Sequence, residues 1–148
     1  MEGDEDLNRK IELAKNPNTP PEILAKLAKD RNLEVKIAVA KNPNTPIEVL
    51  LELYEELKSF IKMSSARNPR TPPETLKKLA DDEDSDVREE VAKNPNATED
   101  ILRKLASDEE WSVRLAVAMN PKSPPDALEK LSEDEDWHVR KAVAKNPN

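Results

Sequence analysis

Apolar residues recur at helical spacing in two short stretches of every 26 residues. In the first stretch two leucines stand three residues apart, and in the second two valines stand four apart beside small alanines. Spacings of three and four put side chains on one side of an α-helix, so each stretch predicts a short amphipathic helix. The leucine pairs are Leu24/Leu27, Leu50/Leu53, Leu76/Leu79, Leu102/Leu105 and Leu128/Leu131, and the valine pairs are Val35/Val39, Val87/Val91, Val113/Val117 and Val139/Val143.

Asn-Pro pairs separate these helix pairs at a constant step of 26 residues. They begin at Asn16, Asn42, Asn68, Asn94, Asn120 and Asn146. One repeat buries too little apolar surface to fold alone, so neighbouring repeats must stack around a continuous core. We therefore predict an all-α, two-layer solenoid that forms a single domain over residues 1–148. It consists of a half repeat (1–15), five repeats (16–41, 42–67, 68–93, 94–119 and 120–145) and the start of a truncated repeat (146–148).

The residues around the prolines predict where the helices begin and end. A hydroxyl residue three places before an acid suggests a capping box at Thr19, Thr45, Thr71 and Ser123. Pro20, Pro46, Pro72 and Pro124 then occupy the first helical position. The fourth repeat has Ala97 and Thr98 instead, so its first helix should begin most loosely or be shifted by a residue. The second helix should end at the asparagine before proline, whose side chain can bond the backbone two residues on.

The unit NPNTPPEILAKLAKDRNLEVKIAVAK, residues 16–41, resembles the leucine-rich repeat variant, a short relative of the HEAT-like repeats. The resemblance covers nearly the whole chain and implies a right-handed superhelix. It also implies that one helix of each pair is 3₁₀, whereas the spacing favours α for both and leaves the form of the short second helix open. A cysteine cluster that binds iron and sulfur precedes the repeats in a known example of the family; this chain has no cysteine, so that function does not transfer.

Composition taken alone would suggest disorder, because 37% of residues are charged, 3% are aromatic and thirteen are proline. All the prolines, however, fall at the repeat boundaries. His138 is the only histidine, and there is no glycine-rich phosphate loop. We predict a protein that is not an enzyme and has no catalytic residue, cofactor or metal. No apolar run reaches membrane-spanning length and no signal-peptide core opens the chain, which predicts a cytoplasmic protein without membrane contact.

Each repeat carries an acid six residues before a base. HEAT-like repeats use a similar spacing as a ladder of charges along the solenoid, and an acid in a loop can accept backbone N–H groups and a neighbouring base together. The alternative is a phosphate-binding stripe, against which the net charge of −7 argues. The ladder residues are Asp30, Lys36, Asp82, Arg88, Asp108, Arg114, Asp134 and Arg140.

Residues that vary between repeats are candidates for a partner surface. Apolar residues stand on the second helices where other repeats carry Glu or Lys, and two tryptophans begin the last two second helices. The tryptophans either face a ligand or cover the ends of the core between repeats. These candidates are Ile37, Met63, Trp111, Leu115, Met119 and Trp137.

The second repeat departs most from the pattern. Leu51, Tyr54, Leu57 and Phe60 add apolar surface, and no proline or glycine interrupts residues 47–67. Either its two helices fuse or bend less sharply, or these residues form a patch for a partner or a second copy of the chain.

These patterns predict a repeat scaffold that binds a protein or peptide on an exposed face. Two alternatives remain: an engineered or excised scaffold with no native partner, and a HEAT-like nucleic-acid binder. Self-association is expected through the second repeat or through the C-terminal end, where the Val139/Val143 face has no following repeat.

Overall fold

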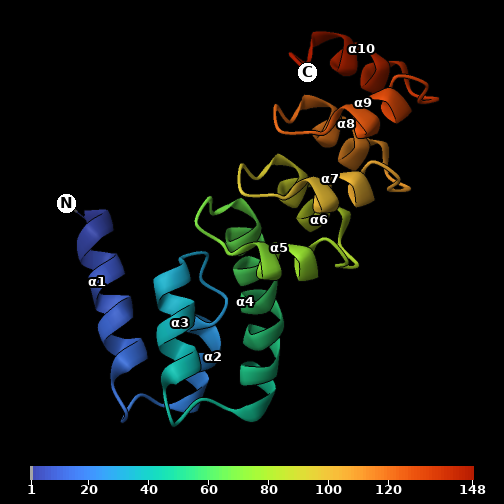
Figure 1. Ribbon diagram of the computed structural model, residues 1–148. Coiled ribbons are helices and arrows are strands. Elements are labelled where there is room, and N and C mark those ends of the chain that lie inside the picture. The colour runs from blue at the N-terminus through green and yellow to red at the C-terminus, as the bar shows by residue number, and fades with distance from the viewer. Residues whose placement is uncertain (1) are drawn as a thin grey trace. The chain divides into compact units, whose positions relative to one another are not determined.

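The chain is all-helical in the computed structural model, which describes residues 2–148 (Figure 1). Both helices of a typical repeat are α-helical, with seven residues in the first and nine in the second. The predicted fold class, a helical repeat solenoid, is confirmed. The helices are α1 (Glu2–Lys15), α2 (Pro21–Leu27), α3 (Leu33–Lys41), α4 (Ile47–Arg67), α5 (Pro73–Leu79), α6 (Ser85–Lys93), α7 (Glu99–Leu105), α8 (Trp111–Met119), α9 (Pro125–Leu131) and α10 (Trp137–Lys145).

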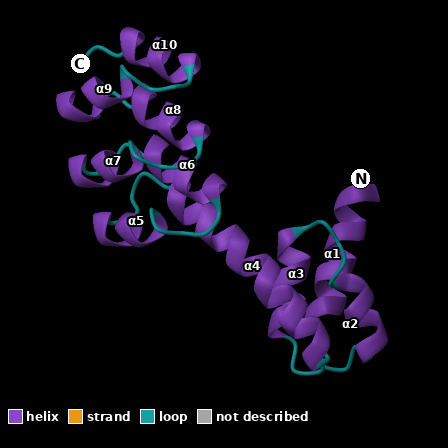
Figure 2. Cartoon of the chain, turned by 90° about the vertical axis from the view of Figure 1, so that its right-hand side faces the viewer, coloured by secondary structure: helices purple, strands orange, loops and turns teal. Residues whose placement is uncertain are grey.

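The packing divides the chain into two compact units, and the division falls within α4. The N-terminal unit ends at Phe60, and the C-terminal unit runs from Ile61 to Asn148. In the N-terminal unit α1, α2 and α3 pack against one another. In the C-terminal unit α6, α8 and α10 form one layer and α5, α7 and α9 the other (Figure 2). The second helices thus share one layer of the repeat stack.

Each unit has its own hydrophobic core, made from the predicted leucine and valine pairs. Leu24, Val35 and Val39 are completely buried in the N-terminal unit. Leu102 and Val117 are equally buried in the C-terminal unit. The core stripes that the spacing predicts are the ones that pack.

The last repeat corrects one expectation. Val139 is fully buried, and Val143 is half-buried against the core of the C-terminal unit. Val139 is therefore not part of an exposed face, and self-association through the C-terminal end stays a prediction.

The second repeat is one continuous helix. Residues 47–67 form the 21-residue α4, so the first of the two outcomes left open above is observed. Val49 and Leu53 pack with the N-terminal core, whereas Met63 and Ala66 pack with the C-terminal core. The turn between the two helices is absent here, where Leu57 and Lys58 occupy positions that are both acidic in the third, fourth and fifth repeats. Neither α4 nor any other helix within residues 2–148 is long and apolar enough to cross a membrane.

The predicted capping boxes are wrong, because the hydroxyl groups serve the preceding helix instead. Thr19 donates its hydroxyl to the carbonyl oxygen of Leu13 at 2.6 Å, and Thr45 donates to Val39 at 2.7 Å. Thr71 and Ser123 make the same bond six residues back. These hydroxyls give the carbonyl groups at the helix end a donor; the Val39 carbonyl, for example, also accepts the N–H of Asn42 at 3.1 Å.

The first helices therefore begin one residue later than predicted. Pro20 precedes α2 with extended backbone angles, and Pro21 is its first residue. In the fourth repeat α7 begins at Glu99, the position equivalent to Pro21, so the predicted shift relative to its sister repeats is wrong. Thr98 compensates for the missing proline because its hydroxyl accepts the N–H of Ile101 at 3.3 Å.

Candidate binding surface

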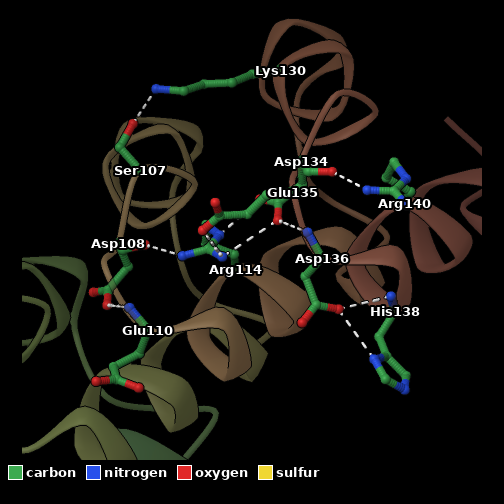
Figure 3. A network of polar contacts seen from close by, with 10 residues as sticks. All are labelled: Ser107, Asp108, Glu110, Arg114, Lys130, Asp134, Glu135, Asp136, His138 and Arg140. Atoms are coloured by element: carbon green, nitrogen blue, oxygen red, sulfur yellow. Dashed lines mark hydrogen bonds and ion pairs between the residues drawn. The ribbon is translucent and has the colours of Figure 1, made fainter.

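The repeat charges form a ladder in which the base of one repeat reaches the acid of the following repeat (Figure 3). Arg140, the last predicted ladder base, has no such acid and binds the carbonyl oxygen of Asp134 in its own repeat. Arg88 pairs with Asp108 at 2.8 Å, and Arg114 pairs with Asp134 at 2.7 Å. Lysines hold the equivalent rungs elsewhere, in the pairs Lys10–Asp30, Lys36–Glu56 and Lys62–Asp82. The ladder thus links neighbouring repeats within each unit.

Both partners of a rung also bind the backbone. Arg114 donates a second hydrogen bond to the carbonyl oxygen of Asp108 in its own repeat, at 2.7 Å, and Arg88 and Arg140 bind the same position of theirs. Asp134 accepts the N–H of Asp136 at 2.9 Å. The adjacent carboxylates raise the pKa of both Arg88 and Arg114. These contacts favour the structural interpretation of the charges over a phosphate-binding stripe.

A second ladder, which the sequence reasoning missed, is made by the repeat asparagines. Asn42, Asn94 and Asn120 are buried, and each donates its side-chain amide to a carbonyl oxygen of the preceding repeat at 2.7–2.8 Å. Their side-chain oxygens accept the N–H two residues on, as the sequence predicts. The constant asparagine at the start of every repeat was the signal for the missed bond. One amide side chain both closes a turn and joins two repeats.

The candidate residues of the second repeat lie on α4 and differ in exposure. Leu51, Tyr54 and Phe60 are exposed, Leu57 is half-buried, and Met63 packs against the C-terminal core. Exposed apolar side chains of this size on one helix are unusual for a surface. Self-association through this part of α4 stays a prediction.

The two tryptophans meet around a histidine that the sequence reasoning did not select. The His138 ring stacks on Trp137, with 4.4 Å between ring centroids, and lies 5.7 Å from the ring of Trp111. The side chain of Lys141 lies over Trp137, with its Nζ 5.3 Å from the centroid. Trp111 is 46% exposed and Trp137 is 55% exposed, so neither is a core residue. The rings form an aromatic cluster open to solvent.

Asp136 holds this cluster in place at the start of α10. Its carboxylate accepts the N–H of His138 at 2.8 Å and lies 3.1 Å from the ring Nδ1 (Figure 3). Partial burial pushes the pKa of Asp136 up, but the hydrogen bonds from His138 outweigh it and lower the pKa overall. Asp136 therefore fixes the histidine between the two indoles.

A groove of about 360 Å³ lies beside the aromatic cluster, between α8 and α10. Leu115 and Met119 line it from α8, and Lys141, Ala142 and Lys145 line it from α10. His138 belongs to both the cluster and the groove. We call the combined area the α8–α10 surface; it unites the candidates Trp111, Leu115, Met119 and Trp137.

The N-terminal unit has a groove at the equivalent place. Its volume is about 330 Å³, and every lining residue lies four repeat lengths before its counterpart. Here the candidate Ile37 replaces Lys141, Glu34 replaces His138, and Lys15 replaces Met119. No tryptophan adjoins it, since the chain has only two. The groove is a feature of the repeat stack, whereas its aromatic rim is particular to the last repeats.

Stacked helix pairs with a shared core and repeated polar rungs define a helical repeat protein. The leucine rich repeat variant family matches residues 111–136. This chain is similar to a solved structure described as a leucine-rich repeat variant with a novel repetitive protein structural motif. The TM-score is 0.54, the sequence identity is 31%, and the match covers 93% of this chain. This chain spans 55% of the length of that chain. No curated protein matches it. The resemblance to the leucine-rich repeat variant that the sequence indicates is therefore confirmed.

Proposed function

We propose that the chain is a non-enzymatic repeat scaffold that binds a segment of a partner protein on the α8–α10 surface. The observation that carries the proposal is the aromatic cluster of Trp111, Trp137 and His138 beside an apolar groove. Tryptophan is one of the residue types enriched among the side chains that dominate binding energy, and here both tryptophans of the chain are about half exposed to solvent. A bound partner would bury apolar surface that the free chain exposes.

The chemistry of the surface suits binding rather than catalysis. It presents indole rings, aliphatic side chains and lysine ammonium groups, which contact a ligand without activating a nucleophile. The groove alone is near the lower end of the range for small-molecule pockets, but the tryptophans extend the surface beyond it. A peptide segment of several residues matches this extended area better than a compact metabolite.

Intrinsic fluorescence provides a direct test, because the only two tryptophans lie in the proposed site. A displayed library of random peptides is selected on the purified chain, and the enriched peptides are synthesised and titrated. We expect them to shift the emission, and we expect Trp137→Ala to weaken binding about tenfold or more, as for a central interface tryptophan. Binding to the single-tryptophan variant is followed through the remaining indole and by calorimetry.

Tyr54→Ser on α4 is the matched control, since it removes another exposed ring far along the sequence. It should leave affinity unchanged. Circular dichroism establishes that each variant keeps its helical content. The proposal is wrong if selected peptides bind the Trp111→Ala and Trp137→Ala variants as tightly as the original chain, or if selection enriches no peptide at all.

A further inference from the structure

We infer that acidic and aliphatic residues alternate in the segment bound on the α8–α10 surface, with a carboxylate at every second position. This inference rests on the proposed function and specifies its partner. It follows from which charges around the groove are already engaged within the chain and from how the two helices divide its lining.

The two lysines that line this groove, Lys141 and Lys145, have no carboxylate partner within residues 2–148. Lys141 contacts the Trp137 ring. In the third repeat the position equivalent to Lys145 is Lys93, which pairs with Glu89 at 3.2 Å. Position 89 is the counterpart of position 141, so the last repeat replaces the acid of that pair with a second base. The result is a local positive site in a chain of net charge −7.

The rest of the surface strengthens this contrast. Acids crowd the loops between first and second helices, as in residues 81–86 and 133–136. Those loops repel an acidic peptide, whereas the two lysines attract it, so complementary charge fixes where such a peptide docks. Asp136, the acid nearest the cluster, is occupied by His138 and does not neutralise the lysines.

The two sides of the groove differ in chemistry, which sets the pattern of the partner. Lys141 and Lys145 lie one turn apart on α10, and Leu115 and Met119 lie one turn apart on α8. Side chains one turn apart on a helix are about 5–6 Å from each other. Residues two apart in an extended peptide are separated by roughly 6.6 Å and point to the same side, while those between them point to the other. Alternate carboxylates can therefore face α10 while alternate aliphatic groups face α8.

Three peptides of equal length test the inference by fluorescence titration and calorimetry. One alternates Glu with Leu, one alternates Gln with Leu, and one alternates Lys with Leu. We expect the Glu peptide to bind most tightly and the Lys peptide least, and the affinity for the Glu peptide to fall as salt rises. A fourth peptide with the Glu and Leu residues in two separate blocks should bind more weakly than the alternating one.

Variants of the lysines locate the effect. Lys141→Met and Lys145→Met each should weaken binding of the Glu peptide about two- to fivefold, the range for an exposed ion pair, and leave the Gln peptide nearly unaffected. Lys41→Met, at the equivalent position of the N-terminal groove, is the control and should change neither. Equal binding of all three peptides that still depends on Trp137 overturns this inference and leaves the proposed function standing. Peptide binding that does not depend on the tryptophans overturns both. If none of the three peptides binds while peptides selected from the library do, only this inference is overturned.

Discussion

The N-terminal unit builds its ladder from lysines, whereas the C-terminal unit adds two arginine rungs to its lysine rung, Lys62–Asp82. In the C-terminal unit Arg88 and Arg114 hold rungs whose side chains are only 8–12% exposed. In the N-terminal unit Lys36 holds the rung to Glu56, whose side chain is 58% exposed. A guanidinium offers a planar fork of donors, whereas an ammonium is a single point of charge. Arginine can therefore bind the next repeat's carboxylate and its own loop carbonyl together in a fixed geometry.

This difference bears on the candidate site. Arg114 extends from α8 and binds Asp134 in the loop that precedes α10, so its rung joins the two helices that carry the α8–α10 surface. The equivalent groove of the N-terminal unit has lysine rungs and no aromatic rim. The better-defined ladder thus accompanies the surface that we propose to be functional.

Removing a core leucine should lower stability most, and the loss should be confined to the unit that contains the leucine. Leu102 and Leu24 are equivalent residues, both fully buried. Each Leu→Ala change is expected to cost about 2–5 kcal/mol through lost burial and the cavity left behind. Hydrogen exchange should show the loss of protection in α7 and α8 for Leu102→Ala and in α2 and α3 for Leu24→Ala. Loss spread evenly over both units in either variant would contradict the division into two cores.

Breaking a rung of the charge ladder should lower the free energy of unfolding less than removing a core leucine does. The loss should be larger in the C-terminal unit than in the N-terminal unit. Asp134→Ala leaves the nearly buried Arg114 without its carboxylate, for an expected loss of about 2–3 kcal/mol in the free energy of unfolding. Glu56→Ala, at the equivalent acid, should cost less than about 1 kcal/mol because that pair is exposed. Urea denaturation measures both. Equal losses would show that the base type and burial of the rung do not matter.

The asparagine ladder offers a smaller contrast. Asn120→Ala removes a buried amide and leaves the Ala92 carbonyl without its donor, which should cost about 1–2 kcal/mol. Asn68 is exposed at the corresponding position, so Asn68→Ala should cost less. Thermal unfolding of the two variants compares them. If Asn68→Ala proved the more damaging, the inter-repeat bond would not be the source of the stabilisation.

Acid should weaken the ladder through its carboxylates. Burial raises the pKa of Asp82, but the hydrogen bonds from Lys62 and from the N–H of Asp84 outweigh it and hold the pKa below its ordinary value. A folded-state pKa that is lowered contributes stability that is present above about pH 4 and is lost as the pH falls through the folded pKa. Asp82→Asn should lower the free energy of unfolding at pH 7. When the pH is lowered, this variant should lose less stability than the original chain. Urea denaturation at pH 7 and pH 3 tests this. Equal losses of stability in the original chain and the variant on going to pH 3 would contradict it.

Most of the fold could be predicted from the sequence because the core residues recur at the same positions of each repeat. The leucine and valine pairs mark the core, and the constant step fixes the order of the helices. The first residues of the first helices could not be predicted from the sequence. A hydroxyl beside proline can either accept an N–H of the following helix or donate to a carbonyl oxygen of the preceding helix. Thr19 and Thr45 bind the preceding helix, a choice decided by how the chain turns between helices.

The candidate site can be predicted only in part from the sequence. The apolar residues that vary between second helices predict Trp111, Leu115, Met119 and Trp137. They do not predict His138, because a single histidine in the sequence indicates only that a histidine-based metal site is absent. The place of His138 in the aromatic cluster depends on its contact with Trp111, one repeat earlier. The replacement of Glu89 by Lys141 is visible in the sequence, but the groove that these lysines line is not. Sequence spacing gives the face of each helix, whereas the distance between faces comes only from the stacked structure.

An NMR titration of the isotope-labelled chain with the alternating Glu and Leu peptide tests the central claim most directly. The account predicts that the indole N–H signals of Trp111 and Trp137 and the amide signals of α8 and α10 shift together on binding, while those of α1, α2 and α3 stay in place. Shifts centred on the N-terminal groove or on α4, with the indole signals unmoved, would contradict it.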